Sequence, residues 1–73
     1  MERLTKQQLD DYCENAGLTK RQKDILRLKY FDERDLSIIQ ICMELSISKT
    51  VYYISHDKML QQIYKYEYIK KDR

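Results

Sequence analysis

The sequence predicts an all-α fold. Among its 73 residues there is no proline and only one glycine, so a β-sandwich would lack its turn residues, while frequent Leu, Ile, Lys, Gln and Glu favour helices. Three segments have the form of a capping box, in which Ser or Thr is followed three residues later by Gln. The length allows one domain, residues 1–73, and is too short for a substrate cleft with its own supporting shell. We therefore expect a small domain of three or four helices and no enzyme.

The first helix is expected from Lys6 to about Ala16. Thr5 and Gln8 form the capping box at its start, where the hydroxyl of the cap residue accepts from a backbone N–H that has no partner within the helix. Gly17, the only glycine, is expected to end this helix as a left-handed C-cap.

The second helix is expected from about Lys20 to Phe31, started by the capping box of Thr19 and Gln22. Its sequence separates an apolar stripe from a basic face. The stripe holds Ile25, Leu28 and Phe31, and the basic face holds Lys20, Lys23 and Arg27. Residues 32–35 then form a polar link to the next helix.

The third helix, Ile38–Leu45, begins at the capping box of Ser37 and Gln40. It is short and almost wholly apolar, so we expect the rest of the fold to surround it. Its Cys42, like Cys13 in the first helix, has neither CxxC spacing nor histidine partners, and both are expected to be buried free thiols. The sequence predicts no metal site, no cofactor and no catalytic residue.

The fourth helix is expected to start at Lys49 behind Ser48 as N-cap and, because no helix breaker follows, to reach Tyr64 or beyond. His56 is expected on its inward face as a half-buried packing residue. Residues 64–73 form an extension rich in tyrosine and lysine. Here Tyr64 and Tyr68 share a helical face, yet the tyrosines also alternate as in a strand, so both conformations stay open. These tyrosines either pack on the first helix or form a homodimer contact.

Charge and hydropathy bear on location and partners. The N-terminus has no signal-peptide pattern and no segment reaches transmembrane length, so we expect a cytoplasmic protein without a membrane partner. The net charge is only +2, but residues 1–17 hold two basic and four acidic side chains, whereas residues 49–73 hold six basic and three acidic ones. A surface that contacts phosphates and a set of solvated helix faces both account for this distribution.

Segment 18–63 resembles two families of transcription proteins. It reads LTKRQKDILRLKYFDERDLSIIQICMELSISKTVYYISHDKMLQQI and is similar to the promoter-reading region four of bacterial sigma factors, with a Leu-Thr-x-x-Gln start, a Leu-Arg-x-x-Tyr-Phe segment and an Ile-Ser turn. Its Ile-Ser turn, paired tyrosines and Lys58-Met59-Leu60 step resemble ArpU-like late-transcription regulators of phages. Because no polymerase-binding segment precedes it, we expect a regulator of a phage or mobile element instead of a full sigma factor.

The resemblance implies a helix-turn-helix at about residues 37–64, whose second helix reads double-stranded promoter or operator DNA. Cys42 takes the place usually held by alanine where the two helices touch. Ser46 takes the usual place of glycine, so the turn is expected to hold a left-handed non-glycine residue. The implied DNA-contacting residues are Ser48, Lys49, Thr50, Tyr53 and Lys58.

A second hypothesis assigns the outward surface of the fourth helix to a protein partner. Ile54 beside Asp57 is a poor match for a groove lined by phosphates and suits a protein surface better. In this reading the chain binds and inhibits a larger regulator or the transcription machinery. The partner-contacting residues are then Val51, Ile54, Asp57, Tyr64 and Tyr68.

Overall fold

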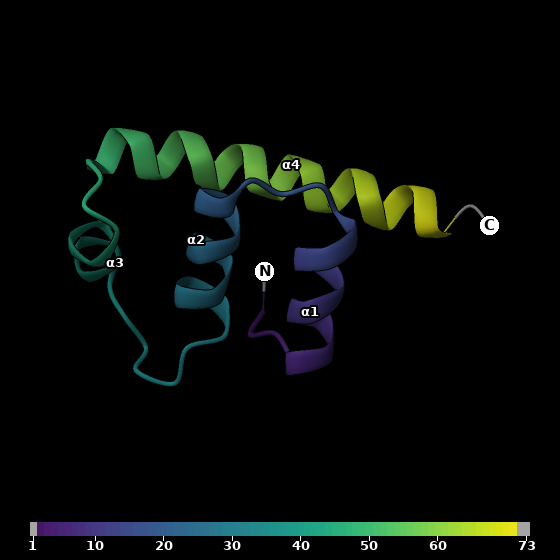
Figure 1. Cartoon of the computed structure of the whole chain (residues 1–73), viewed down its shortest axis with the longest axis horizontal. Helices are drawn as coiled ribbons and strands as arrows, with labels where there is room; N and C mark the ends of the chain where they lie inside the picture. The colour runs from purple at the N-terminus through teal and green to yellow at the C-terminus, as the bar shows by residue number, and fades with distance from the viewer. Residues whose placement is uncertain (1, 72–73) are drawn as a thin grey trace.

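The computed structural model describes residues 2–71, which form four helices. These are α1 (Lys6–Asn15), α2 (Lys20–Tyr30), α3 (Ile38–Leu45) and α4 (Lys49–Lys71) (Figure 1). Within this range there is no strand, so the all-α prediction is confirmed. Helix α4 runs the length of the molecule, α1 and α2 lie side by side across it, and α3 lies near its start (Figure 1). Met1, Asp72 and Arg73, the last two belonging to the expected extension, lie outside the described residues.

All four helix starts were predicted correctly. In each capping box the backbone N–H of the glutamine donates to the cap hydroxyl over 3.1–3.2 Å, and the cap N–H donates to the glutamine side-chain oxygen over 2.8–3.0 Å. The boxes pair Thr5 with Gln8, Thr19 with Gln22, and Ser37 with Gln40. Ser48 is the N-cap of α4, since its Oγ accepts from the N–H of Val51 over 3.2 Å. This cap is not part of a capping box. Local hydrogen bonds therefore divide the chain into its helices.

The first two helices end one residue earlier than expected. Helix α1 stops at Asn15, followed by Gly17 with φ +73°, the left-handed conformation predicted for it. Helix α2 stops at Tyr30, and Phe31 is its C-cap. The hydrogen bonds of the last helical turn compete with those of the turn that follows, so the position of a helix end commonly shifts by a residue.

Helix α2 is the centre of the core because it packs against all three other helices. Ile25 and Leu28 of the expected stripe are buried, but Leu26 is fully buried as well. A single apolar stripe on α2 can pack against only one neighbouring helix. Because α1, α3 and α4 all pack on α2, a second face of this helix is buried as well. Figure 1 shows α2 between α1 and α3 and beneath α4.

Helix α3 is not surrounded by the fold, and that prediction was wrong. Ile41 and Cys42 face inward with exposures of 0% and 7%, whereas Ile39 and Met43 are 55% and 74% exposed. Helix α3 packs against α2 and α4 along one face only, and no element covers its other face in residues 2–71. Its apolar composition therefore exceeds what its burial requires.

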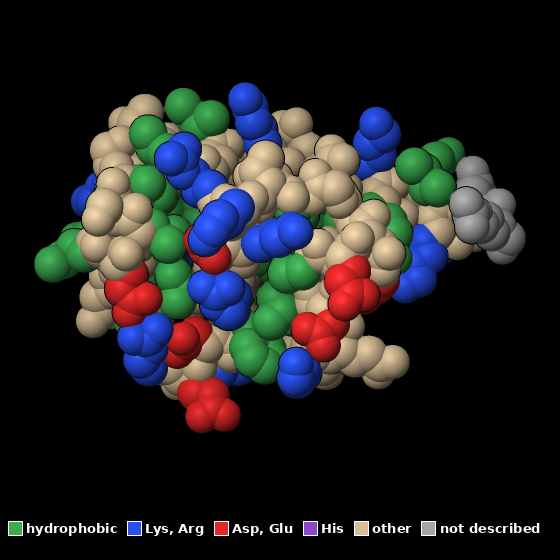
Figure 2. Space-filling view, viewed as in Figure 1, with side chains coloured by type: hydrophobic (Ala, Val, Ile, Leu, Met, Phe, Trp, Pro, Cys, Tyr) green, Lys and Arg blue, Asp and Glu red, His purple; other side chains and the backbone are tan. Residues whose placement is uncertain are grey.

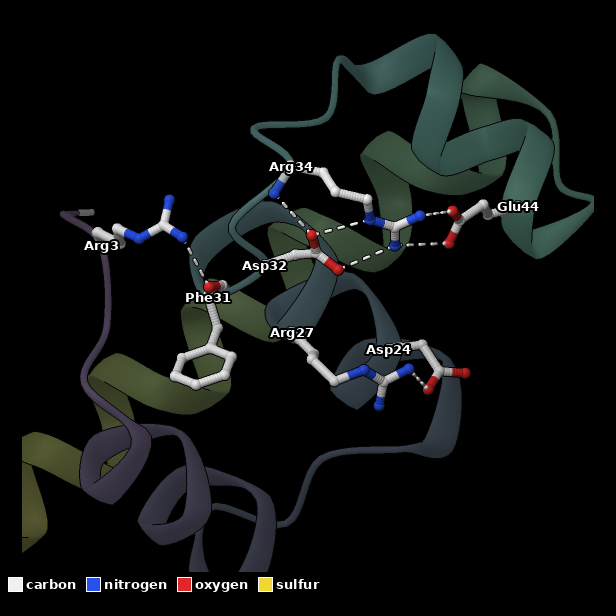
Figure 3. A network of polar contacts seen from close by, with 7 residues as sticks. All are labelled: Arg3, Asp24, Arg27, Phe31, Asp32, Arg34 and Glu44. Carbon is white, nitrogen blue, oxygen red and sulfur yellow. Dashed lines mark hydrogen bonds and ion pairs between the residues drawn. The ribbon is translucent and has the colours of Figure 1, made fainter.

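The connections on either side of α3 are held by specific contacts. Ser46 adopts the left-handed conformation at φ +55° and ψ +46°, as expected, and the N–H of Ile47 donates to the carbonyl of Cys42 over 3.0 Å. Before α3, the Arg34 guanidinium donates to Asp32 over 2.9 Å and to Glu44 over 2.6 Å, which ties the loop to the helix (Figure 3). Hydrogen bonds from Arg34 lower the pKa of Asp32 to about 2.

The tyrosine-rich extension is helical as far as Lys71, so the strand alternative is excluded there. Tyr66 is the tyrosine that packs on α1: its ring meets that of Tyr12 edge to face, with centroids 6.2 Å apart, and its hydroxyl donates to Asp11 over 2.7 Å. The hydroxyl of Tyr12 in turn donates to Glu67 over 2.7 Å. No helix in residues 2–71 has both the length and the hydropathy needed to span a membrane.

Candidate nucleic-acid interface

The inward face of α4 fixes the orientation of the helix. Tyr52, Met59 and Ile63 are at most 1% exposed. His56 is half-buried between Tyr30 and Tyr52, with ring centroids 5.8 and 5.6 Å away, and its Nε2 lies 2.6 Å from the hydroxyl of Tyr30. Burial lowers the pKa of His56 and favours the neutral ring. His56 is a packing residue, as the sequence predicted.

The opposite face of α4 exposes the side chains that the sequence singled out. Lys49 and Thr50 are exposed in the first turn, and Tyr53 is 49% and Ile54 52% exposed one turn later. Asp57 and Lys58 are exposed, and Val51 is half-buried. The structure therefore brings the candidate DNA-contacting residues onto one end of α4, together with Ile54 and Asp57 of the alternative reading.

Ser48 is the N-cap of α4, as the sequence predicted. Its Oγ accepts from the N–H of Val51, and its carbonyl lies 3.9 Å from the Sγ of Cys42. The acceptor side of the hydroxyl is therefore engaged in capping, while its hydrogen can donate to an external oxygen. Cys42, 7% exposed, lies where α3 and α4 meet, as the resemblance implied.

A groove of about 750 Å³ runs between the start of α2 and the first turns of α4. Its apolar lining comes from Leu45, Val51 and Ile54, and its basic side chains are Lys20, Arg21 and Lys58. Asp24 also lines the groove, but it is held by Lys20 over 3.8 Å and by Arg27 over 3.1 Å. The groove thus joins two basic residues of α2 to the exposed start of α4.

Sequence reasoning missed Lys20 and Arg21 as site residues. The basic face of the second helix was visible in the sequence, but no local pattern tied it to the fourth helix. Figure 2 shows Lys and Arg side chains gathered over α2 on one face of the molecule, with acidic side chains mostly to either side. Such a surface attracts phosphate groups more strongly than the net charge of +2 suggests.

The two cysteines and the tail complete the set of predicted residues. Both cysteines are free thiols, but only Cys42 is buried as expected; Cys13 is half-buried, and its partial burial raises its pKa. Tyr64 and Tyr68 are 58% and 70% exposed near the far end of α4, away from the groove. In residues 2–71 no group of three His, Cys, Asp or Glu side chains is placed to hold a metal ion.

Comparison of the chain with protein-family models, with curated proteins and with solved structures returns no match. The geometry of α3, the turn and α4, together with the basic groove, is therefore the basis for assigning a function.

Proposed function

We propose that this protein is a DNA-binding transcriptional regulator of a phage or mobile element, in which α3 and α4 act as a helix-turn-helix. The observation that carries the proposal is the groove that sets Lys20, Arg21 and Lys58 beside the exposed start of α4. An α-helix fits the major groove of B-DNA, and basic side chains beside such a helix meet the phosphates that border the groove.

Each exposed residue at the start of α4 offers chemistry suited to DNA. Lys49 supplies a mobile positive charge, and Thr50 supplies a hydroxyl that donates to or accepts from a base edge. Tyr53 supplies a phenol that donates to phosphate, and Ser48 supplies the hydroxyl hydrogen left over from capping. Lys58 lies two turns further on in the groove, where its charge is placed for a phosphate.

A double substitution tests this assignment. Lys49→Ala with Tyr53→Ala removes two exposed side chains. The ring of Tyr53 meets that of the buried Tyr52 edge to face, with centroids 5.4 Å apart, so the domain should lose some stability but stay folded while specific DNA binding is lost. Gel-shift titrations with the promoters next to its gene measure the affinity, and circular dichroism verifies folding. Lys6→Ala, an exposed lysine on α1, is the control for loss of charge alone. A folded double variant with unchanged DNA affinity would remove α4 from the interface.

The alternative, a protein-interaction module that inhibits a larger regulator or the transcription machinery, is favoured by one observation. Ile54 is 52% exposed beside Asp57, and the uncovered face of α3 adds Ile39 and Met43. Ile54→Glu would place an uncompensated charge in such an interface and abolish a complex with the protein partner. The same substitution would weaken DNA binding only in part, so a pull-down with the transcription machinery run beside the gel shift separates the two functions.

A further inference from the structure

The C-terminal half of α4 carries an exposed stripe that no part of residues 2–71 covers. Its members follow at intervals of four, three, four and three residues, the spacing that keeps side chains on one side of a helix facing a second helix. They are Asp57, Gln61, Tyr64, Tyr68 and Lys71. At 1.5 Å per residue the stripe is about 21 Å long. We use the name C-terminal stripe for these five residues.

The C-terminal stripe points away from the core. Tyr64 and Tyr68 are 58% and 70% exposed, and the side chain of Asp57 is 72% exposed. The opposite face of the same segment is occupied, because Ile63 is buried and Tyr66 is bonded to α1. Two large aromatic side chains on adjacent turns thus face solvent, and tyrosine is a residue type enriched at protein–protein interfaces.

We propose that the C-terminal stripe pairs with the same stripe of a second copy of this chain, with the two α4 helices antiparallel. A two-fold axis at Tyr64 then sets the Tyr64 side chains of the two copies against each other. Gln61 of one copy meets Tyr68 of the other, and Asp57 of one copy meets Lys71 of the other. The pairing is isologous, so each contact away from the two-fold axis occurs twice, and the Tyr64 pair on the axis occurs once.

The order of charges along the stripe selects a second copy in this orientation. Asp57 stands at one end and Lys71 at the other, so an antiparallel pair joins opposite charges at both ends. A parallel pair would set Asp57 against Asp57 and Lys71 against Lys71, which is repulsive. The neighbouring Lys70 is directed to α1 instead, where its Nζ lies 3.1 Å from Asp11. Lys71 is therefore the lysine of the last turn that is left for a partner.

The dimer is independent of the proposed DNA binding. None of the proposed DNA-contacting residues belongs to the C-terminal stripe: Lys49 and Thr50 lie toward opposite ends of the pair, and Lys58 follows Asp57 without being part of it. Self-association is measured without DNA, so failure of the dimer would leave the proposed function untouched, and failure of DNA binding would leave the dimer untouched. An interface made by the five residues of the C-terminal stripe in each copy is small, so we expect the dimer to form only at high protein concentration.

Charge reversals test the proposal by sedimentation equilibrium at high-micromolar concentration. The wild type should approach twice the chain mass of 9.0 kDa. Asp57→Lys and Lys71→Asp should each sediment as monomers, because each sets like charges together at both ends of an antiparallel pair. An equimolar mixture of the two variants and the double variant Asp57→Lys/Lys71→Asp should both regain the dimer mass, because both restore opposite charges.

Lys65→Asp is the matched control, since Lys65 is exposed on the same helix but outside the stripe, and this variant should dimerise as the wild type does. Circular dichroism melts establish that each variant is folded. A wild type that stays monomeric at every concentration overturns the proposal. So do folded single variants that dimerise as the wild type does, because that result is expected of a contact elsewhere. A folded double variant that fails to dimerise also overturns it, because this variant restores both pairs of opposite charges in an antiparallel dimer.

Discussion

The hydroxyl of Tyr30 at the end of α2 lies 2.6 Å from Nε2 of His56 in the middle of α4. This contact joins the helix at the centre of the core to the helix that we propose reads DNA. When the neutral imidazole carries its hydrogen on Nδ1, the hydroxyl donates to Nε2. The ring also stacks on Tyr30 and Tyr52, so its position sets how α4 crosses α2.

The stability of the domain should fall as His56 becomes protonated. Burial lowers the pKa of His56 below its ordinary value of 6.5, with Asp57 opposing and Lys29 reinforcing the shift. The unfolded chain therefore binds the proton more readily, and the stability present above pH 6.5 is lost as the pH falls through the folded pKa. His56→Phe keeps an aromatic ring and removes the titration. Melting temperatures measured between about pH 7 and pH 5 should decline more in the wild type than in this variant.

Between about pH 7 and pH 5 the titration of His56 is separated from that of Asp32 and Asp11. Asp32, with a pKa of about 2, and Asp11, whose pKa is lowered first by the hydrogen bond from Tyr66, stay ionised throughout this pH range. An equal decline in wild type and His56→Phe would show that the destabilisation comes from another group.

Ser46→Gly should stabilise the domain. Ser46 holds φ +55°, where a Cβ is sterically unfavourable, and glycine adopts this conformation without that strain. The expected gain is about 0.5–1 kcal/mol, measured by urea unfolding. Ser55→Gly, within α4, is the control and should cost about 0.5 kcal/mol, because glycine is less favourable than serine in a helix interior. Destabilisation by Ser46→Gly would mean that the serine side chain contributes a contact of its own.

The two faces of α3 should respond differently to truncation. Ile41→Ala removes a fully buried side chain and should cost about 2–5 kcal/mol. Ile39→Ala makes the same chemical change two residues earlier at a position that is 55% exposed, and should change stability by less than about 0.5 kcal/mol. Denaturant midpoints of the two variants provide the comparison. Similar losses for both would indicate that the exposed face is covered in solution.

The salt dependence of binding should distinguish DNA from a protein partner. Each phosphate contact contributes about 0.9 to the slope of log affinity against log salt concentration, so Arg21→Ala and Lys58→Ala should each lower the slope for DNA by about one. Lys6→Ala should leave it unchanged. A wild-type affinity for its best ligand that hardly varies over a fourfold salt range would favour the interaction module centred on Ile54.

The helix starts were determined by the sequence alone. A capping box closes hydrogen bonds between residues three apart, so Thr5, Thr19 and Ser37 act before any distant contact forms. The same holds for the left-handed Gly17, because backbone conformation at a helix end depends on its immediate neighbours. The left-handed conformation of Ser46 was expected from the family resemblance. The inward position of His56 on α4 was also readable, since it follows from helical periodicity.

Burial and the candidate site depended on how the helices cross. Composition made α3 look enclosed, but only its contacts with α2 and α4 decide that Ile41 is buried and Ile39 is not. Among three tyrosines with similar spacing, only Tyr66 reaches α1. Arg21 and Lys58 share a groove although they lie far apart in the sequence. Periodicity defines the faces of each helix, whereas which face meets which neighbour is set by packing the four helices around one core, a property of the whole chain.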